Sequence, residues 1–426
     1  MPRRAAIVAG CRTPFARSGT VLKNMTAIDL GTLAVRDLMD RSDIPGKEVD
    51  HLVYGTVVPY PHAPNIAREV GLATLPVTVP AVTVSSACAS SNQAIANGVD
   101  LIERGYANVV VAGGAESLSH IPITMKQSFA EKLIGASKAK TFKGRLSAIA
   151  KIRPRDLVPS FPQIAEPTTG ESMGESAERM AKENGISRSD QDSWALRSHQ
   201  LAAAATKDGR LRSEIAPLYV PRNFDTVIET DNGIRTETNE QELAKLRPAF
   251  DLRYGSVTAG NASPLTDGGS GVILMSEERV KVHGIKPLGY IRSHAFAGLD
   301  PSGQLLQGPA YAAPIALDRA GVTMADIGLM EMHEAFAAQV LSNLQAFSSR
   351  KFAEEELGRS EAVGHPDVDC INVMGGSIAI GHPFGATGAR LTTTLLNEMR
   401  RRDVELGMIT TCAAGGLGFA MVLEMG

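Results

Sequence analysis

The two ends of the chain carry the same succession of features, and this internal repeat constrains the fold more than any other part of the sequence. The first copy is predicted as strand, helix and strand over Ala5–Gly10, Cys88–Glu103 and Asn108–Gly114. The second copy is predicted as strand, helix and strand over Ile371–Met374, Thr387–Arg401 and Met408–Thr411. In each copy a turn of small residues precedes the helix, and a Gly-Gly pair closes or follows the last strand. Two similar α/β units explain this pattern.

Further segments fit the same alternation of strands and helices. The apolar spacing predicts helices over Ala27–Leu38 and Glu331–Ser348, and strands over His51–Thr56, Val82–Val84 and Asp326–Met330. Alternation of this kind indicates an α/β fold with largely parallel pairing. A chain of 426 residues exceeds the usual size of one hydrophobic core, so we expect two or three domains.

The middle of the chain, residues 121–250, differs in character from both ends. Its first part, residues 121–160, holds nine basic and only two acidic residues, with apolar residues at roughly helical intervals. A pair of basic amphipathic helices on a membrane surface or a partner protein would show this pattern, and so would a solvated insertion. Further along, Gly185–Asp208 is predicted as a surface helix with its N-cap at Ser187.

Charge and cysteine content exclude several classes of protein. The formal charge is −3, with 43 Lys and Arg against 46 Asp and Glu, whereas nucleic-acid-binding proteins normally carry a clear basic excess. The four cysteines include no CxxC pair, which argues against a zinc knuckle, a redox dithiol or a disulfide framework. We therefore expect reduced thiols and a cytoplasmic location. No secretory leader and no membrane span is predicted.

Familiar cofactor and metal motifs are also missing from the sequence. There is neither a GxGxxG after a strand nor a phosphate-binding GxxxxGK[ST] loop, and no GxSxG elbow. His333-Glu334 begins like a zinc-protease motif, but Ala337 stands where the second histidine would be required. We expect no metal and no cofactor.

Cys88 is the strongest single candidate for chemistry. It lies in Val84-Ser-Ser-Ala-Cys-Ala-Ser-Ser, where a strand gives way to a helix of small residues. The N-terminus of a helix favours a thiolate, and small neighbours leave room for a substrate. A buried structural cysteine is the alternative interpretation.

Three further reactive side chains occur at strand-to-helix or strand-to-turn junctions. His382 lies within a run of glycines and could accept the proton of a thiol. Cys412 stands at a strand end, and a thiol there could exchange a proton with carbon. His333 is predicted to open a helix directly after a strand, a position suited to holding water or an oxyanion. Each has a core-packing alternative, but sites in α/β folds gather at such junctions.

At these residues the sequence resembles the thiolase family over nearly the whole chain, from Arg12-Thr-Pro-Phe to Gly415-Gly-Leu-Gly. The matching blocks surround Cys88 and His382 and include Lys245-Leu-Arg-Pro-Ala-Phe, Val257-Thr-Ala-Gly-Asn-Ala-Ser and Thr411-Cys-Ala-Ala-Gly-Gly. Met332-His333-Glu-Ala-Phe, where many thiolases carry Asn instead of His, and the basic insertion most resemble the thiolase subunit of fatty-acid β-oxidation complexes.

The resemblance implies a five-layer αβαβα core of two similar halves with an inserted loop domain. It places residues 1–120 and 251–282 in the N-terminal half and residues 283–426 in the C-terminal half. Residues 121–250 form the loop domain, which binds CoA and carries the basic insertion. The resemblance also implies a homodimer, and a hydratase/dehydrogenase subunit as a possible partner in an α2β2 complex.

The implied reaction is thiolytic cleavage of a 3-ketoacyl-CoA by CoA, with CoA as substrate. Cys88 would become acylated after His382 accepts its proton, and Cys412 would protonate the departing enolate. His333 would order a water at the enolate oxygen, and the backbone N–H groups of Cys88 and Ala414 would hold the tetrahedral oxyanion. The family's CoA contacts match Met173, Arg235, Ser263 and Leu265.

Three alternatives compete with this degradative function. A biosynthetic acetoacetyl-CoA thiolase would use the same residues on a four-carbon substrate. A decarboxylating ketosynthase uses a cysteine with two histidines, so Cys412 argues against it. A non-catalytic lipid or membrane adaptor would keep the fold without the chemistry.

Overall fold

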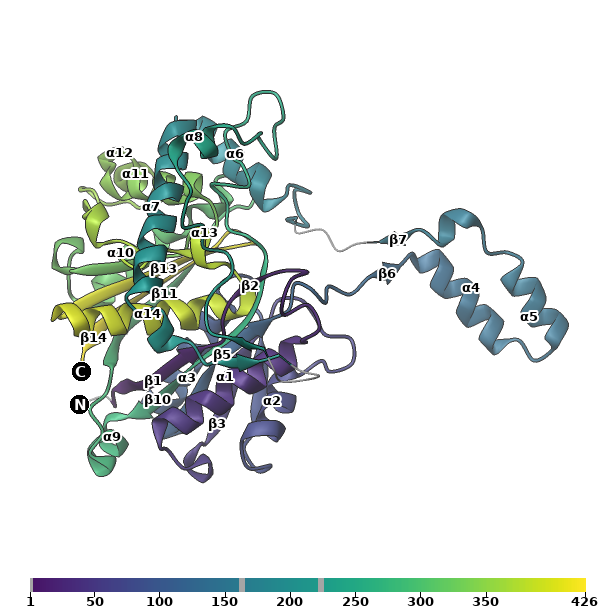
Figure 1. Cartoon of the computed structure of the whole chain (residues 1–426), viewed down its shortest axis with the longest axis horizontal. Helices are drawn as coiled ribbons and strands as arrows, with labels where there is room; N and C mark the ends of the chain where they lie inside the picture. Colours follow the sequence, from purple (N-terminus) through teal and green to yellow (C-terminus); the bar gives the residue numbers. More distant parts are fainter. Residues whose placement is uncertain (1–2, 161–164, 221–225) are drawn as a thin grey trace.

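The computed structural model describes residues 3–160, 165–220 and 226–426 of the 426-residue chain. Residues 1–2, 161–164 and 221–225 fall within the predicted N-terminal half and loop domain and lie outside the described residues. Figure 1 shows two α/β halves packed against each other, with a pair of helices projecting to one side.

The two halves arrange their strands in the same spatial order. Across the N-terminal half the order is β1 (Ala5–Arg12), β10 (Thr266–Ser276), β5 (Val109–Glu116), β3 (His51–Gly55) and β4 (Ala81–Val84). Across the C-terminal half it is β11 (Gly289–Gly298), β14 (Leu417–Met425), β13 (Leu406–Ala413) and β12 (Leu329–Met332). A single parallel bridge from Ile371 to Met330 stands where the first half has β4. The prediction of two similar halves is confirmed.

The two sheets join into one continuous path, but the strands are mixed in direction. The join is short, through Ala6–Tyr290 and Ile7–Gly289 between β1 and β11, and β2 (Ala16–Arg17) pairs with β10. Among the strand pairs of the described residues, only β3–β4, β3–β5 and β12–β13 are parallel. The prediction of largely parallel pairing was wrong, because the last strand of each half, β10 or β14, runs antiparallel to both of its neighbours. β14 follows β13 through a hairpin turn, and β10 follows the long segment 117–265 rather than the single crossover helix that usually joins parallel neighbours.

Helices cover and separate the two sheets to give five layers. α1 (Ala27–Ser42) and α2 (Ile66–Thr74) pack on one face of the N-terminal sheet, and α10 (Gly308–Ala320) packs on one face of the C-terminal sheet with α11 (Ala337–Ser348) beside it. α3 (Ser90–Glu103) and α14 (Thr387–Arg402) contact each other between the sheets. The central apolar core therefore combines side chains of both halves, among them Ile95, Leu274, Leu391 and Met421. The predicted αβαβα core is confirmed.

The segment between the halves forms an arm and a covering layer. The arm consists of α4 (Gln127–Lys138) and α5 (Phe142–Ile149), and it is tethered by the pairing of β6 (Thr124–Met125) with β7 (Pro159–Ser160). Figure 1 shows the arm standing clear of the body. The covering layer contains α6 (Met173–Glu183), α7 (Arg188–Lys207), β8 (Leu218–Tyr219), β9 (Val227–Ile228) and α8 (Glu240–Ala244). We propose the domain division that the sequence resemblance implies.

The helix predicted over Gly185–Asp208 is α7, and its environment differs from the prediction. Ser187 is its N-cap and accepts a hydrogen bond from the N–H of Asp190, as expected. The helix is not a surface helix, however, because Trp194, Ala195 and Ser198 are buried. α7 packs against α11 and against the short α13 (Ser377–Ile380) next to the glycine-rich turn.

Three local predictions in the C-terminal half need correction. The strand predicted over Asp326–Met330 is shifted to Leu329–Met332, and the following helix begins at Ala337 rather than Glu331. Ile371–Met374 is not a strand. The side chain of Asn372 accepts from the N–H of Met332 and donates to its carbonyl, so it replaces the backbone pairing that a strand would make.

The remaining α-helices of the described residues are α9 (Glu277–His283) and α12 (Arg350–Glu356). None of the helices within the described residues has both the length and the apolar character needed to cross a bilayer.

Candidate active site

Cys88 lies on a sharp turn between β4 and α3. Ala87, directly before it, has φ 46°, a left-handed conformation that costs a residue with a side chain of order 1 kcal/mol or more. The hydroxyl of Ser90 holds this turn, because it accepts from the N–H of Ser86 at 2.9 Å and donates to the carbonyl of Ala87 at 2.7 Å. The nucleophile candidate is therefore fixed by the backbone rather than carried on a mobile loop.

His382 is held by the glycine-rich turn between α13 and α14. Gly381 has φ 116°, and a Cβ there would come within 2.6 Å of Thr266, so only glycine fits. The N–H of His382 donates to the carbonyl of Pro264 at 3.3 Å, which ties the turn to the segment before β10. Nδ1 of its ring lies 2.7 Å from Oγ1 of Thr387, the first residue of α14.

His333 lies directly after β12 and reaches the same place. The helix that follows begins only at Ala337, so His333 belongs to a strand-to-helix loop and does not open the helix as predicted. Its ring centroid lies 4.1 Å from that of His382. The donor atoms of Cys88, His333 and His382 all lie within 4.8 Å of one another, and both imidazoles are buried.

Cys412 occupies the next-to-last position of β13 and is 1% exposed. Burial raises the pKa of its thiol well above the usual value, and the charge of a Cys88 thiolate would raise it further, so the two sulfurs are neighbours. β13 and β14 are joined by a hairpin turn that begins at Ala414, which does not have positive φ. Alanine therefore meets no backbone strain at this position.

Burial disfavours the charged forms of Cys88 and His382 in the free protein. Burial of the sulfur raises the pKa of Cys88 to about 12, although the side chain as a whole retains partial exposure. Backbone N–H groups of Ala414 and of Cys88 itself hydrogen-bond the sulfur and oppose this rise. Burial, and then the charge of Arg390, lowers the pKa of His382 to about 3. Backbone N–H donors do favour the Cys88 thiolate, as expected at this turn, but burial of the sulfur outweighs them.

The residues predicted to contact CoA lie along the rim of this cluster and on the loop domain. Ser263 and Leu265 belong to a segment that bridges both catalytic loops: the N–H of Ser263 donates to Ala335, and Leu265 pairs with His382. Met173 begins α6 and packs against the apolar cluster that contains Cys412.

Arg235 lies further out, on the loop domain. Its N–H donates to Nδ1 of the buried His199 at 3.2 Å. Burial, and then the charge of Arg235, lowers the pKa of Arg17. Two guanidinium groups therefore share one region, and their combined positive field suits phosphate groups.

Sequence reasoning missed several buried residues that hold the site together. Glu334, next to His333, accepts from the side chains of Trp194, Ser198 and Asn372 and from the N–H of Ile378, and so fixes the His333 loop. Glu166 of the loop domain accepts from the N–H of Gly415 in the turn after Cys412. The only sequence signal for Glu334 was its position beside His333.

Two thiols and two imidazoles meet after the ends of strands, an arrangement suited to chemistry through a thioester intermediate. Comparison with known families agrees: residues 5–278 match "Thiolase, N-terminal domain" and residues 285–425 match "Thiolase, C-terminal domain". The chain belongs to the thiolase family.

Within that family, the chain is similar to proteins named 3-ketoacyl-CoA thiolase. It is 51% identical to the one from Yersinia enterocolitica and 52% identical to the one from Yersinia pestis, in each case over 99% of this chain and 97% of the relative. Among solved structures, Bacillus anthracis acetyl-CoA acetyltransferase matches with a TM-score of 0.85 and 33% identity, covering 99% of each chain. Human mitochondrial 3-ketoacyl-CoA thiolase in complex with CoA matches with a TM-score of 0.83 and 31% identity, covering 100% of this chain and 98% of that one.

Proposed function

We propose that this thiolase is a 3-ketoacyl-CoA thiolase that catalyses the last step of fatty-acid β-oxidation. It converts a 3-ketoacyl-CoA and CoA into acetyl-CoA and an acyl-CoA shortened by two carbons. The observation that carries the proposal is the meeting of Cys88, His382 and Cys412 at one site in a chain about half identical to proteins of that name.

The first half-reaction is acylation of Cys88. As its sulfur attacks C3 of the substrate, the thiol proton passes to Nε2 of His382, which is neutral because its pKa is low. The C2–C3 bond then breaks, and the electron pair moves into the enolate of acetyl-CoA. Cys412 donates its proton to C2, which leaves acetyl-CoA, a Cys412 thiolate and an acyl group on Cys88.

The second half-reaction returns one proton to Cys412 and one to Cys88. The Cys412 thiolate accepts the proton of an incoming CoA thiol, and the CoA sulfur attacks the thioester on Cys88. As the Cys88–carbonyl bond breaks, His382 returns its proton to the Cys88 sulfur, and the shortened acyl-CoA leaves. No redox partner and no cofactor enters this balance, and CoA acts only as a substrate.

Two groups of donors stabilise the negative oxygens of these steps. The N–H groups of Cys88 and Ala414 hold the tetrahedral oxyanion, a role consistent with their hydrogen bonds to the Cys88 sulfur. His382 and a water ordered by His333 hold the enolate oxygen. Met173, Ser263 and Leu265 bind the pantetheine portion of CoA, and Arg235 faces its nucleotide phosphates.

Mass spectrometry of the acyl-enzyme tests the nucleophile and the substrate class together. Incubation with 3-ketoacyl-CoA substrates of increasing length, without free CoA, is expected to leave on Cys88 an acyl group two carbons shorter than each substrate. C370S is the matched control, because Cys370 lies outside the site and its replacement is expected to leave the adduct in place. C88S is expected to give no adduct and no thiolysis, whereas undiminished thiolysis by C88S would refute the proposal.

The same experiment separates the competing functions. Adducts and turnover confined to four-carbon substrates would indicate a biosynthetic acetoacetyl-CoA thiolase. An adaptor would form no adduct with any substrate. A decarboxylating ketosynthase has the Cys88–His333–His382 set but no need for Cys412, so full activity of C412S would favour it.

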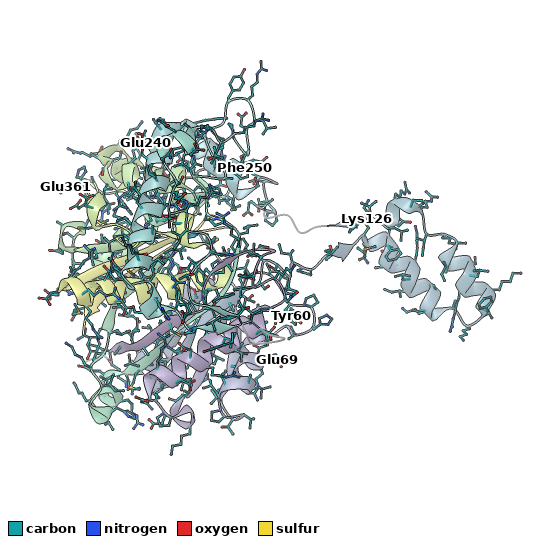
Figure 2. The ribbon with its side chains drawn as sticks, viewed as in Figure 1. Tyr60, Glu69, Lys126, Glu240, Phe250 and Glu361 are labelled. Atoms are coloured by element: carbon teal, nitrogen blue, oxygen red, sulfur yellow. The ribbon has the colours of Figure 1, made fainter. Side chains whose placement is uncertain are left out.

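We further propose that the arm is a docking surface for a hydratase/dehydrogenase subunit or an anionic bilayer, and that the enzyme is a homodimer. Phe142 is 82% exposed and Leu146 is 58% exposed, within a segment of nine basic and two acidic residues. Figure 2 shows the side chains of the arm surrounding only its own helices, with Lys126 at its base. Because Cys88 and Cys412 must stay reduced, we propose a cytoplasmic location.

A further inference from the structure

The structure assigns a positioning role to Ser377 and Arg390, two residues that touch no substrate atom in the proposed reaction. We propose that they form a relay that fixes His333 as an N–H donor into the active site. The inference rests on the proposed thiolase reaction and adds to it the residues that set the protonation of one imidazole.

The relay follows from counting donors and acceptors around Ser377. Nη2 of Arg390 donates to Oγ of Ser377 at 2.8 Å, and a guanidinium can only donate. Oγ of Ser377 lies 2.9 Å from Nδ1 of His333. Among the described residues, Nδ1 is the acceptor that the structure offers to the Ser377 hydroxyl proton. Ser377 therefore donates to Nδ1, and the proton of the neutral imidazole must reside on Nε2.

The free nitrogen of His333 faces the reacting groups. Nε2 is buried and has no hydrogen-bond partner within the described chain. One ring nitrogen of His333 lies within 4.8 Å of a ligand atom of Cys88 and of His382. Because Nδ1 is taken by Ser377, we assign that nitrogen as Nε2. A buried N–H without a protein partner costs roughly 1–3 kcal/mol, so this donor is available for a water or a substrate oxygen.

In His382 the ring proton lies on Nδ1, the opposite of its position in His333. Oγ1 of Thr387 lies 2.7 Å from Nδ1 of His382, and the same hydroxyl donates to the carbonyl of Pro383 at 3.5 Å. Thr387 therefore accepts from Nδ1–H, which leaves the lone pair of Nε2 for the proton of Cys88. Two adjacent imidazoles thus present an acceptor and a donor to the same site.

The charges around His333 keep it neutral. Burial, then the neighbouring His382 and Arg390, lowers the pKa of His333 well below its usual value. Arg390 is buried and paired with Glu331 at 3.0 Å, and the Glu334 carboxylate accepts from Trp194 and Ser198. The thiols of Cys88 and Cys412 complete the groups near the ring, and both have raised pKa values.

The relay is needed because residue 333 is a histidine and not an asparagine. An asparagine amide offers an N–H in every protonation state, whereas a neutral imidazole offers one only from the nitrogen that carries the proton. A protonated Nε2 also has no lone pair for a metal ion, which favours thiol chemistry over metal binding by Cys88, His333 and His382.

The test replaces Ser377 and measures thiolysis as a function of pH. S377A is expected to lower kcat about tenfold, because His333 loses its fixed proton, and to change the KM for CoA less than twofold. Removing a donor from Nδ1 makes protonation of His333 easier, so the acid limb of the kcat profile is expected to move to higher pH. S342A is the matched control, since Ser342 is a buried serine outside the site with no polar partner within the described chain.

Repeating the S377A substitution in the H333N variant distinguishes a positioning role of Ser377 from a role in packing. In H333N the amide needs no tautomer selection, so adding S377A is expected to change kcat less than twofold and to leave the pH profile in place. S377C keeps the volume with a weaker donor and serves if S377A fails to fold. Equal losses in both backgrounds, or an unshifted acid limb for S377A and S377C, would overturn the relay. Absence of thiolysis in the unmodified enzyme would instead refute the proposed function.

Discussion

The backbone N–H of Gly385 donates to the carboxylate of Glu116 at 3.0 Å and joins the His382 turn to the end of β5 in the other half. The same carboxylate accepts from Thr56 Oγ1 and from the N–H groups of Val57 and Val58. One buried side chain therefore links the half that supplies Cys88 to the half that supplies His382.

Replacing Glu116 tests this link. E116Q keeps the volume but replaces one oxygen, which can accept a hydrogen bond in either protonation state, by an NH2 group that can only donate, so at least one backbone N–H loses its acceptor. We expect unfolding to become easier by roughly 2 kcal/mol and kcat to fall at least tenfold, as measured by denaturant unfolding and steady-state thiolysis. E103Q, on the exposed end of α3, is the control and is expected to leave both quantities unchanged.

The raised pKa of Glu116 also predicts in which direction the stability of the protein changes with pH. Burial raises the pKa of Glu116 from 4.5 to about 7, so the folded state retains this proton at pH values where the unfolded chain has lost it. The contribution of the group to stability is therefore present below about pH 4.5 and lost as pH rises through about 7. The stability difference between the unmodified protein and E116Q should shrink across this window, and a constant difference would contradict the shift.

The neutral Cys88–His382 pair predicts how the free enzyme reacts with an alkylating reagent. Because the pKa of Cys88 is raised to about 12, its alkylation rate is expected to rise roughly tenfold per pH unit up to pH 10 without a plateau. Peptide-resolved mass spectrometry would follow each cysteine, with C370S removing the other partly exposed thiol. A plateau near pH 7 would indicate a preformed thiolate–imidazolium pair.

Cys412 should be needed for the carbon–carbon step more than for acyl transfer. C412S is expected to lower thiolysis of a 3-ketoacyl-CoA by about 10²–10⁴-fold, because a serine hydroxyl is a poor proton donor to the enolate and a poor base afterwards. Cys88 should still become acylated by an acyl-CoA that lacks the 3-keto group, measured as a mass increase. Loss of this labelling together with thiolysis would argue against the division of roles.

Thr387 should orient His382 through its hydroxyl. T387V is nearly isosteric but removes the acceptor for Nδ1–H, so we expect kcat to fall about tenfold with little change in the KM for CoA. T392V is the control, because Thr392 lies on the same helix and donates only to the backbone carbonyl of Gly388. Equal effects of the two substitutions would point to the helix rather than to the imidazole.

Removing the arm should separate docking from catalysis. Deletion of residues 126–155 leaves β6 and β7 able to pair across a short loop, and the arm stands clear of the body (Figure 1). We expect unchanged thiolysis by the isolated enzyme but loss of binding to a hydratase/dehydrogenase subunit or to anionic liposomes. Replacing Phe142 and Leu146 by serine tests the apolar contribution alone, and unaltered binding to both targets would refute the docking role.

The sequence predicted most of the fold and the side chains that meet at the candidate site, because both leave local signals. Strand and helix periodicity located the repeated unit, and small residues around Cys88, His382 and Cys412 marked the junctions. Strand direction was mispredicted, because periodicity is the same for parallel and antiparallel strands. Ser377 and Glu116 could not have been found this way, since their partners His333 and Gly385 lie 44 and 269 residues away.

The two halves that join at β1 and β11 supply different residues of the candidate site. The N-terminal half contributes Cys88, and the C-terminal half contributes His333, His382 and Cys412. The two halves are therefore not interchangeable, because each carries only part of the candidate site. The reaction therefore takes place at the seam between two copies of one unit.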